Sequence, residues 1–223
     1  MNRSLEILKS IYKPYRYTLK GKATILETTS GNFLVKPKNK DLNELYNYLI
    51  SRGFDNFPKL IDASRKDVNV FEYVETIRMP KEQMCDDIID LIASLHNKTS
   101  YFKEVSEDTY KEIYEDIKSN IAYLKNYYDT LYEIGFNEVY QSPSTYQLMR
   151  NFYKINAALD FASKELDEWY ELIKGETKIR VCIVHNNLCI DHFLKSNKEV
   201  LISWDNYLID TPVIDIVKLY KNE

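Results

Sequence analysis

The sequence predicts an α+β protein of two lobes, a small antiparallel β lobe followed by a larger and mainly helical lobe. Short strand-like runs dominate residues 17–74, helical periodicity fills residues 85–173, and a β pattern returns from residue 179. We therefore place the β lobe at residues 1–74 and the helical lobe at residues 75–223. A cleft between two such lobes is a common place for a ligand.

The β lobe is predicted from turn and capping signals. The stretch "TSGN" at 29–32 offers a glycine-containing turn between strands at 23–28 and 33–36. A helix follows, with leucines and a tyrosine on one face, Asp41 as its cap and Gly53 as its stop. Two further short apolar runs close the lobe, at 59–63 and 68–73. The predicted order over the first 74 residues is β-β-β-α-β-β.

The second lobe is predicted from its 3.6-residue period. Apolar residues share one face of "CDDIIDLIASLHNK", and longer helical periods run through 107–135 and 144–173. The "SPS" at 142–144 separates these two long helices. The runs "IRVCIV" and "EVLISW" then predict a β hairpin, with the polar stretch "HNNLCIDH" between its strands.

Composition narrows the function classes. A net charge of −4 argues against a nucleic-acid partner, which a basic face would normally indicate. The sequence has neither a signal-peptide pattern nor a run of 18 apolar residues, so we expect a cytoplasmic protein without a membrane span. Three cysteines without a CxxC pair are typical of reduced structural thiols.

Several segments together resemble the protein-kinase-like fold of the aminoglycoside phosphotransferases and choline kinases, and most closely the CotS-type spore-coat kinase-like proteins. "GNFLVKP" resembles the strand whose lysine, here Lys36, reaches nucleotide phosphates. "LNELYNYLISRGF" resembles the following helix, and Glu44 would be the ion-pair partner of that lysine. "VFEYVE" resembles the hinge that faces an adenine ring, which assigns Phe71, Glu72, Tyr73 and Val74 to cofactor binding.

The polar loop keeps the spacing of a kinase catalytic loop, H-x-D-x4-N, followed by an Asp after the next strand. His185 and Asn187 stand at the first two positions and His192 at the third. "LISWDN" resembles the family's "VIDWE" and aligns Ser203 with its metal-binding Asp, and "DTPVIDI" resembles the downstream "GDPAFDLA". The resemblance implies ATP and Mg²⁺ as cofactors and extends from about residue 17 to the last residue.

Three departures remove the chemistry that this spacing serves. Asn187 carries no charge and is no useful base near neutral pH. His192 suits zinc, iron or copper better than Mg²⁺, and Ser203 is a neutral, weaker ligand. Asp205 or Asp191 would restore a metal site only with shifted geometry. His185 would brace the loop by hydrogen bonds rather than react.

Other readings of these residues stay open. Lys36 can be an ordinary strand-end lysine, Glu44 a solvated helix residue, and His96 a partner of helix-end carbonyls. A zinc site from both loop histidines and an aspartate is conceivable, although we expect His185 and His192 on opposite sides of the loop. Cys189 as a nucleophile is less favoured than Cys189 as a packing residue.

These observations predict a catalytically degenerate kinase-like protein with a binding or scaffolding role. The resemblance adds association with a spore coat or envelope, and hence with the forespore. The alternative is an active ATP-dependent phosphotransferase that acts on a small hydroxyl-bearing substrate. Kinase-like proteins of this type usually continue for several helices after "DTPVIDI", so we expect this chain to be shortened at its C-terminus, within the lobe that sets substrate specificity.

Overall fold

The computed structural model describes residues 2–106 and 108–222. The chain forms two compact units, Met1–Phe102 with Arg180–Glu223, and Lys103–Ile179. The boundary that we predicted at residue 74 coincides with neither limit of these units. It lies inside the first unit, which therefore contains both the β lobe and the polar loop.

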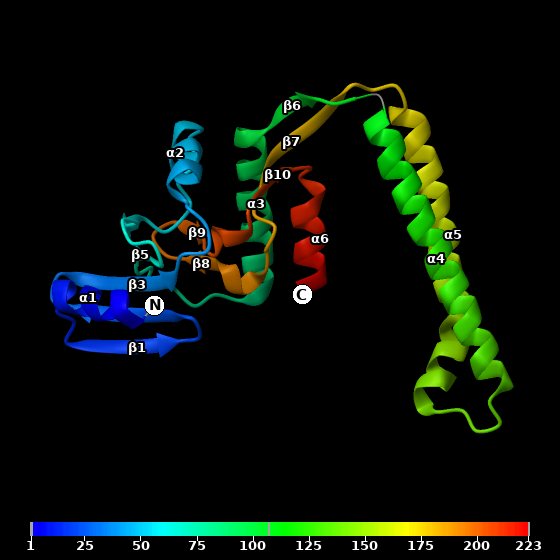
Figure 1. The fold of residues 1–223 in the computed structure, drawn as a ribbon, viewed down its shortest axis with the longest axis horizontal. Coiled ribbons are helices and arrows are strands. Elements are labelled where there is room, and N and C mark those ends of the chain that lie inside the picture. The colour runs from blue at the N-terminus through cyan, green and yellow to red at the C-terminus, as the bar shows by residue number, and fades with distance from the viewer. Residues whose placement is uncertain (1, 107, 223) are drawn as a thin grey trace. The chain divides into compact units, whose positions relative to one another are not determined.

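The first unit holds most of the elements (Figure 1). Its helices are α1 (Asn2–Tyr12), α2 (Asn43–Ser51), α3 (Lys81–Thr99) and α6 (Val213–Asn222). Its strands are β1 (Arg16–Lys20), β2 (Ala23–Thr28), β3 (Gly31–Pro37), β4 (Leu60–Asp62), β5 (Val68–Glu72), β8 (Phe193–Lys195), β9 (Glu199–Leu201) and β10 (Leu208–Asp210). Two chain segments cross its boundary, β6 (Tyr101–Glu104) and β7 (Lys178–Val184).

The five-stranded antiparallel sheet has the order β1-β2-β3-β5-β4. The predicted turn at 29–32 joins β2 to β3, so the hairpin is confirmed. Side chains alternate between the two faces of a strand. In β3, Val35 packs with Leu26 of β2 and Val70 of β5 on one face, whereas Leu34 and Lys36 face the other way.

Helix α1 covers the first of these faces, and the sequence interpretation missed it. Leu5 and Leu8 pack against the sheet, and Leu8 is fully buried. The helix also presents Ile11, which is 57% exposed. Its amphipathic pattern, with Leu5, Leu8 and Tyr12 at helical spacing, was a signal that could have found it. Contact with the sheet stabilises so short a helix.

The main core lies on the other side of the sheet and unites the β lobe with the polar loop. Leu45 and Leu49 of α2, Ile88 and Leu95 of α3, and Trp204 belong to one buried cluster. Trp204 is 1% exposed and meets Phe54 and Phe57 edge-on. The two predicted lobes thus share one hydrophobic core.

The predicted β hairpin around the polar loop is wrong. Strand β7 pairs with β10 in the three-stranded sheet β10-β7-β6, whereas β9 pairs with β8 in a separate two-stranded sheet. The loop therefore connects two different sheets. The strands β6, β8 and β10 have three or four residues each, too few to give a period-2 signal.

The second unit consists mainly of a helical hairpin, α4 (Asp108–Asn137) and α5 (Pro143–Ile173), whose helices lie side by side (Figure 1). Both were predicted, and the "SPS" break is the start of α5. Ser142 accepts a hydrogen bond from the Thr145 amide, and Pro143 occupies the first turn. A serine cap is favoured because its hydroxyl accepts a hydrogen bond from an otherwise unpaired backbone N–H. A proline in the first turn is favoured because it has no backbone N–H to leave unpaired.

We predict that α1 stabilises the sheet through Leu8. Leu8→Ala should lower the free energy of unfolding by about 2–4 kcal/mol, since the side chain is fully buried against β2, β3 and β5. Urea denaturation followed by circular dichroism measures this change. Ile11→Ala, on the exposed side of the same helix, should change it by less than about 0.5 kcal/mol. Equal effects of both substitutions would contradict the packing role of α1.

Candidate functional site

A cavity of about 570 Å³ lies beneath the five-stranded sheet, on the face opposite α1. Its apolar wall comes from cross-strand neighbours, because Ile25 pairs with Leu34 and Leu34 pairs with Phe71. Lys36 follows two residues after Leu34 and therefore lies on the same face. The full lining is Lys20, Ala23, Ile25, Leu34, Lys36, Leu42, Tyr46, Pro58, Phe71, Glu72, Tyr73, Val74, Thr76, Asp191, His192, Leu194, Ile202, Ser203, Trp204 and Asp205.

Most residues that the sequence selected border this cavity. It gathers Lys36, the hinge residues Phe71 to Val74, and the three residues expected at metal positions, His192, Ser203 and Asp205. Three selected residues, Glu44, His185 and Asn187, are not in its lining. The chain thus brings together segments more than 160 residues apart.

The carboxylate of Asp215 in α6 is fully buried and accepts hydrogen bonds from the polar loop. Its Oδ2 accepts the backbone N–H of His185 at 2.8 Å and the Nε2–H of His96 at 2.9 Å. Its Oδ1 accepts the backbone N–H of Asn186 at 2.7 Å. Asn186 has a left-handed backbone with φ 56°, which asparagine tolerates better than most residues. Asp215 therefore fixes the first turn of the loop.

His185 is a bracing residue, as its burial and contacts indicate. Its ring is fully buried and donates from Nε2 to the Ile202 carbonyl at 2.8 Å. The ring lies edge-on to Trp204, with 4.9 Å between centroids. Burial lowers the pKa of His185 below its ordinary value of 6.5. A neutral imidazole in this position ties the loop to the segment that carries Ser203.

Asn187 and His192 are joined across the loop. His192 Nδ1 lies 2.6 Å from the Asn187 carbonyl oxygen and donates to it. This contact and a backbone hydrogen bond from the His192 amide to Cys189 hold a 3-10 turn at Ile190–His192. The imidazole of His192 then reaches the cavity, whereas Asn187 stands outside its lining. An amide at position 187 accepts hydrogen bonds and does not take up a proton near neutral pH.

The rings of the two loop histidines lie near each other, but only His192 borders the cavity. Their ring centroids are 6.0 Å apart. A nitrogen of each ring is already occupied, since His185 Nε2 and His192 Nδ1 both donate to backbone carbonyls. These bonds hold the rings to backbone rather than to a common metal position.

Lys36 binds Asp205 and Ser203, not Glu44. Its Nζ lies 3.4 Å from Asp205 Oδ2 and 3.4 Å from Ser203 Oγ. Ser203 has a left-handed backbone, with φ 69° and ψ 48°, a conformation that costs free energy for a residue with a side chain. Glu44 is exposed in the first turn of α2, so the expected ion pair between Lys36 and Glu44 is wrong.

Tyr46 is the residue of α2 that faces this pair, and the sequence interpretation counted it only as a core residue. It is 5% exposed, it borders the cavity, and burial together with the charge of Asp205 raises the pKa of its phenol. It lies two residues beyond Glu44, so it belongs to the opposite side of α2. Its helical spacing with Leu42, Leu45 and Leu49 predicted that Tyr46 is buried, and the same spacing could have indicated that it faces the site.

The described residues do not fit a magnesium ion well. Within residues 2–106 and 108–222, no group of three or more His, Cys, Asp or Glu side chains stands close enough to hold a metal. Mg²⁺ requires near-octahedral oxygen ligands. Here one carboxylate, Asp205, faces a lysine ammonium instead, and Ser203 supplies only a neutral hydroxyl to the same ammonium.

The hinge leaves its backbone open toward a ligand. The amide of Glu72 donates to Lys59 and that of Tyr73 donates to Asn32, which completes the sheet. In the part of the chain that the structure describes, no hydrogen bond uses the backbone groups of residues 74–76. Unpaired backbone groups beside an apolar wall are suited to the edge of a heterocyclic ring.

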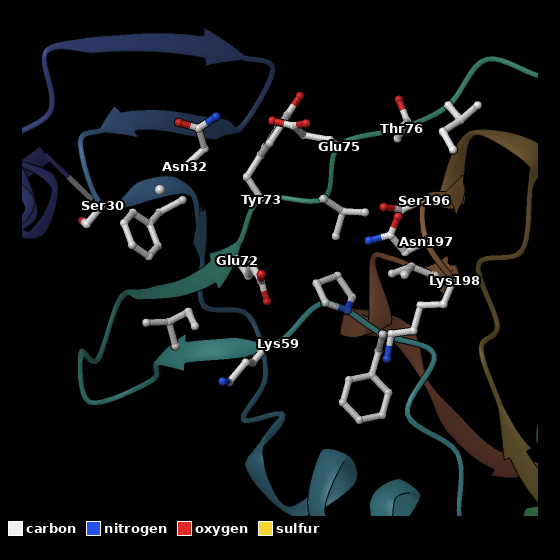
Figure 2. A pocket seen from close by; sticks show the side chains of 18 residues that line it. Ser30, Asn32, Lys59, Glu72, Tyr73, Glu75, Thr76, Ser196, Asn197 and Lys198 are labelled. Atoms are coloured by element: carbon white, nitrogen blue, oxygen red, sulfur yellow. The ribbon is translucent and has the colours of Figure 1, made fainter.

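A second cavity of about 950 Å³ adjoins the same hinge (Figure 2). Figure 2 shows Glu72 and Tyr73 on one side of it and Ser196 and Asn197, from the turn between β8 and β9, on the other. Lys198 at its edge is bound to the carboxylate and carbonyl of Asp55. This cavity is larger, but it contains neither Lys36 nor the polar loop, so the candidate site is the smaller one.

Comparison with solved structures identifies the fold. An aminoglycoside phosphotransferase from Alicyclobacillus acidocaldarius superposes with a TM-score of 0.66, at 11% identity, over 93% of this chain and 67% of that one. The AMP-bound spectinomycin phosphotransferase APH(9)-Ia superposes with a TM-score of 0.55, at 12% sequence identity, over 96% of this chain and 72% of that one. Choline kinase LicA from Streptococcus pneumoniae superposes with a TM-score of 0.51, at 19% sequence identity, over 97% of this chain and 74% of that one.

This is the fold of aminoglycoside phosphotransferases and choline kinase. The fold class predicted from the sequence, a β lobe with a helical lobe, is therefore confirmed. The chain spans about two thirds to three quarters of the length of these proteins. Its sequence matches no family model and no curated protein. Among the described residues, no helix combines the length and the hydrophobicity that a membrane crossing requires.

We predict that Asp215 is the main support of the loop. Asp215→Asn replaces an acceptor oxygen by a donor NH₂ group facing N–H donors, so it should lower the free energy of unfolding by roughly 2–3 kcal/mol. Urea denaturation measures the loss. The matched substitution Asp191→Asn, at an exposed position of the same loop, should cost less than about 0.5 kcal/mol. A loss at Asp215 no larger than at Asp191 would contradict this role.

We also predict acid sensitivity from His185. Below pH 6.5 the unfolded chain binds a proton that the folded chain, with its lowered His185 pKa, does not bind. The free energy of unfolding should therefore fall as the pH falls from 6.5 toward the folded pKa, by up to about 1.4 kcal/mol per pH unit. Urea denaturation at pH 7.5, 6.5 and 5.5 tests this. His185→Gln should show a shallower slope, and equal slopes would contradict the assignment.

Proposed function

We propose that this chain binds an adenine nucleoside or nucleotide in the cavity beneath the sheet and does not transfer a phosphoryl group. The cavity volume, the apolar wall of Ile25, Leu34 and Phe71, and the open hinge backbone support ring binding. APH(9)-Ia, which shares the fold, has been solved with AMP bound. The base would stack between the sheet and the loop segment, and the hinge backbone would pair with its edge.

The pairing of Lys36 with Asp205 and Ser203 is the observation that carries the non-catalytic part of this proposal. Phosphoryl transfer needs a carboxylate at the attacking hydroxyl and hard oxygen ligands for the metal that bridges the phosphates. Position 187 carries an amide, and the partly buried carboxylate of Asp205 is engaged by Lys36. Were Mg²⁺ bound, it would neutralise phosphate charge, but the residues present here do not form its ligand set.

The role that follows is binding without turnover. A kinase fold that retains its cavity while lacking the base can report ligand occupancy to a partner protein or hold one in place. The spore-coat or envelope association implied by the resemblance to CotS-type proteins remains a prediction, and fractionation of sporulating cells with an antibody to this chain would test it.

We predict that filling the cavity removes ligand binding. Adenosine or AMP at 100 times its Kd should stabilise the full chain by about 2.7 kcal/mol, seen as a rise in Tm. Ile25→Trp, which places an indole on the cavity wall, should remove this rise. Leu19→Trp adds the same ring at an exposed position of β1 and should preserve it. An unchanged rise in Ile25→Trp would place the ligand elsewhere.

A transfer assay separates binding from catalysis. With ATP, Mg²⁺ and small hydroxyl-bearing acceptors, we expect no ADP above the rate without protein. ADP formation that depends on Mg²⁺ and disappears in Asn187→Ala would overturn the non-catalytic proposal and establish the alternative, an active phosphotransferase with displaced ligands. A rise in Tm of several degrees that requires Mg²⁺ would weigh in the same direction.

A further inference from the structure

The charges around the cavity disfavour a polyanion. Two lysines line it, Lys20 and Lys36, against three carboxylates, Glu72, Asp191 and Asp205. Lys20 is exposed at the end of β1, and Figure 2 shows the Glu72 side chain directed toward the second cavity. Asp191 is exposed as well, so the inner wall presents Lys36 and Asp205, a pair whose charges cancel. A ligand with several negative charges therefore meets no net positive charge in the described part of this site.

The Lys36 pair is itself an obstacle to phosphate. The side chains of Lys36 and Asp205 are 26% and 19% exposed, so water screens their attraction less than at an open surface. A phosphate that approaches Lys36 must displace the Asp205 carboxylate or accept its repulsion at short range. Tyr46 adds a neutral phenol, because burial and Asp205 keep its pKa raised.

The turn between β1 and β2 does not form a phosphate-binding loop. Lys20 pairs directly with Ala23, so only Gly21 and Lys22 form the turn between β1 and β2. Gly21 has φ 59°, which a tight two-residue hairpin turn requires. Anion sites built from backbone need several successive N–H groups aimed at one point. A turn of two residues is too short to wrap a triphosphate.

We propose that the cavity selects an uncharged nucleoside over its phosphorylated forms, and that Asp205 determines this selectivity by neutralising Lys36. The inference rests on the proposed function, since it takes the nucleoside base to occupy the cavity beneath the sheet. Its consequence is an order of affinity, adenosine above AMP and AMP above ATP, which Mg²⁺ does not invert.

Isothermal titration of the full chain with adenosine, AMP and ATP, first in EDTA and then in Mg²⁺, tests the order. We expect the Kd of ATP to exceed that of adenosine by about tenfold or more, the equivalent of one lost charged interaction. Tighter binding of ATP or AMP than of adenosine would overturn this inference while leaving the proposed function standing. Absence of binding by all three would overturn both.

Substitutions of Asp205 and of Lys36 test whether their ion pair determines the preference for adenosine over AMP. Asp205→Asn frees Lys36 and should lower the ratio of the AMP Kd to the adenosine Kd by about tenfold. Lys36→Met leaves Asp205 unpaired and should raise the same ratio. The two variants move the ratio in opposite directions, so either one tests the proposal if the other fails to fold.

Asp90→Asn is the matched control, because it removes the same charge at an exposed position of α3 outside the cavity lining. It should leave the ratio of the two Kd values within about twofold of the native chain, since water and salt screen the charge of an exposed side chain. A ratio that shifts equally in Asp90→Asn and Asp205→Asn would show that net charge, rather than the Lys36 pair, sets the selectivity and would overturn the assignment of Asp205.

Discussion

The buried carboxylate of Asp215 is the interaction on which the candidate site depends. It links α6 to α3 through His96 and holds the first turn of the polar loop through two backbone amides. A buried charge is costly unless hydrogen-bond donors surround it, and here three donors do so. With that turn fixed, His185 reaches the Ile202 carbonyl and places Ser203 and Asp205 across from Lys36. The loop geometry is thus maintained by groups that take no part in ligand chemistry.

The groups that support the loop differ from the residues on which the non-catalytic proposal rests. The supporting groups, Asp215, His185 and Trp204, belong to the core or bond to backbone, so they contribute to folding whether or not a substrate reacts. The side chains of Asn187 and Ser203 make none of these supporting contacts.

The proposed nucleoside selectivity follows from the charges around the cavity. In a site that binds a metal nucleotide, a cation neutralises the phosphates. Here the inner cation is Lys36, and Asp205 occupies it. The apolar wall and the hinge backbone take no part in this pairing, so the two proposals assign base recognition and phosphate recognition to different residues. In these proposals, nucleoside selectivity and the absence of phosphoryl transfer have one physical cause, the pairing of Lys36 with Asp205.

Local sequence patterns were sufficient to predict most of the longer elements and the order of the candidate site segments along the chain. Turn residues specified the β2–β3 hairpin, the 3.6-residue period specified α2 to α5, and register placed Lys36, the hinge and the loop in one fold. Tertiary structure alone decided the partners. It paired β7 with β10 rather than β9, gave α1 a sheet to cover, and joined Lys36 to Asp205 rather than Glu44. Local patterns encode which face of an element is buried, whereas partner choice depends on contacts between residues far apart in the chain, which no local pattern records.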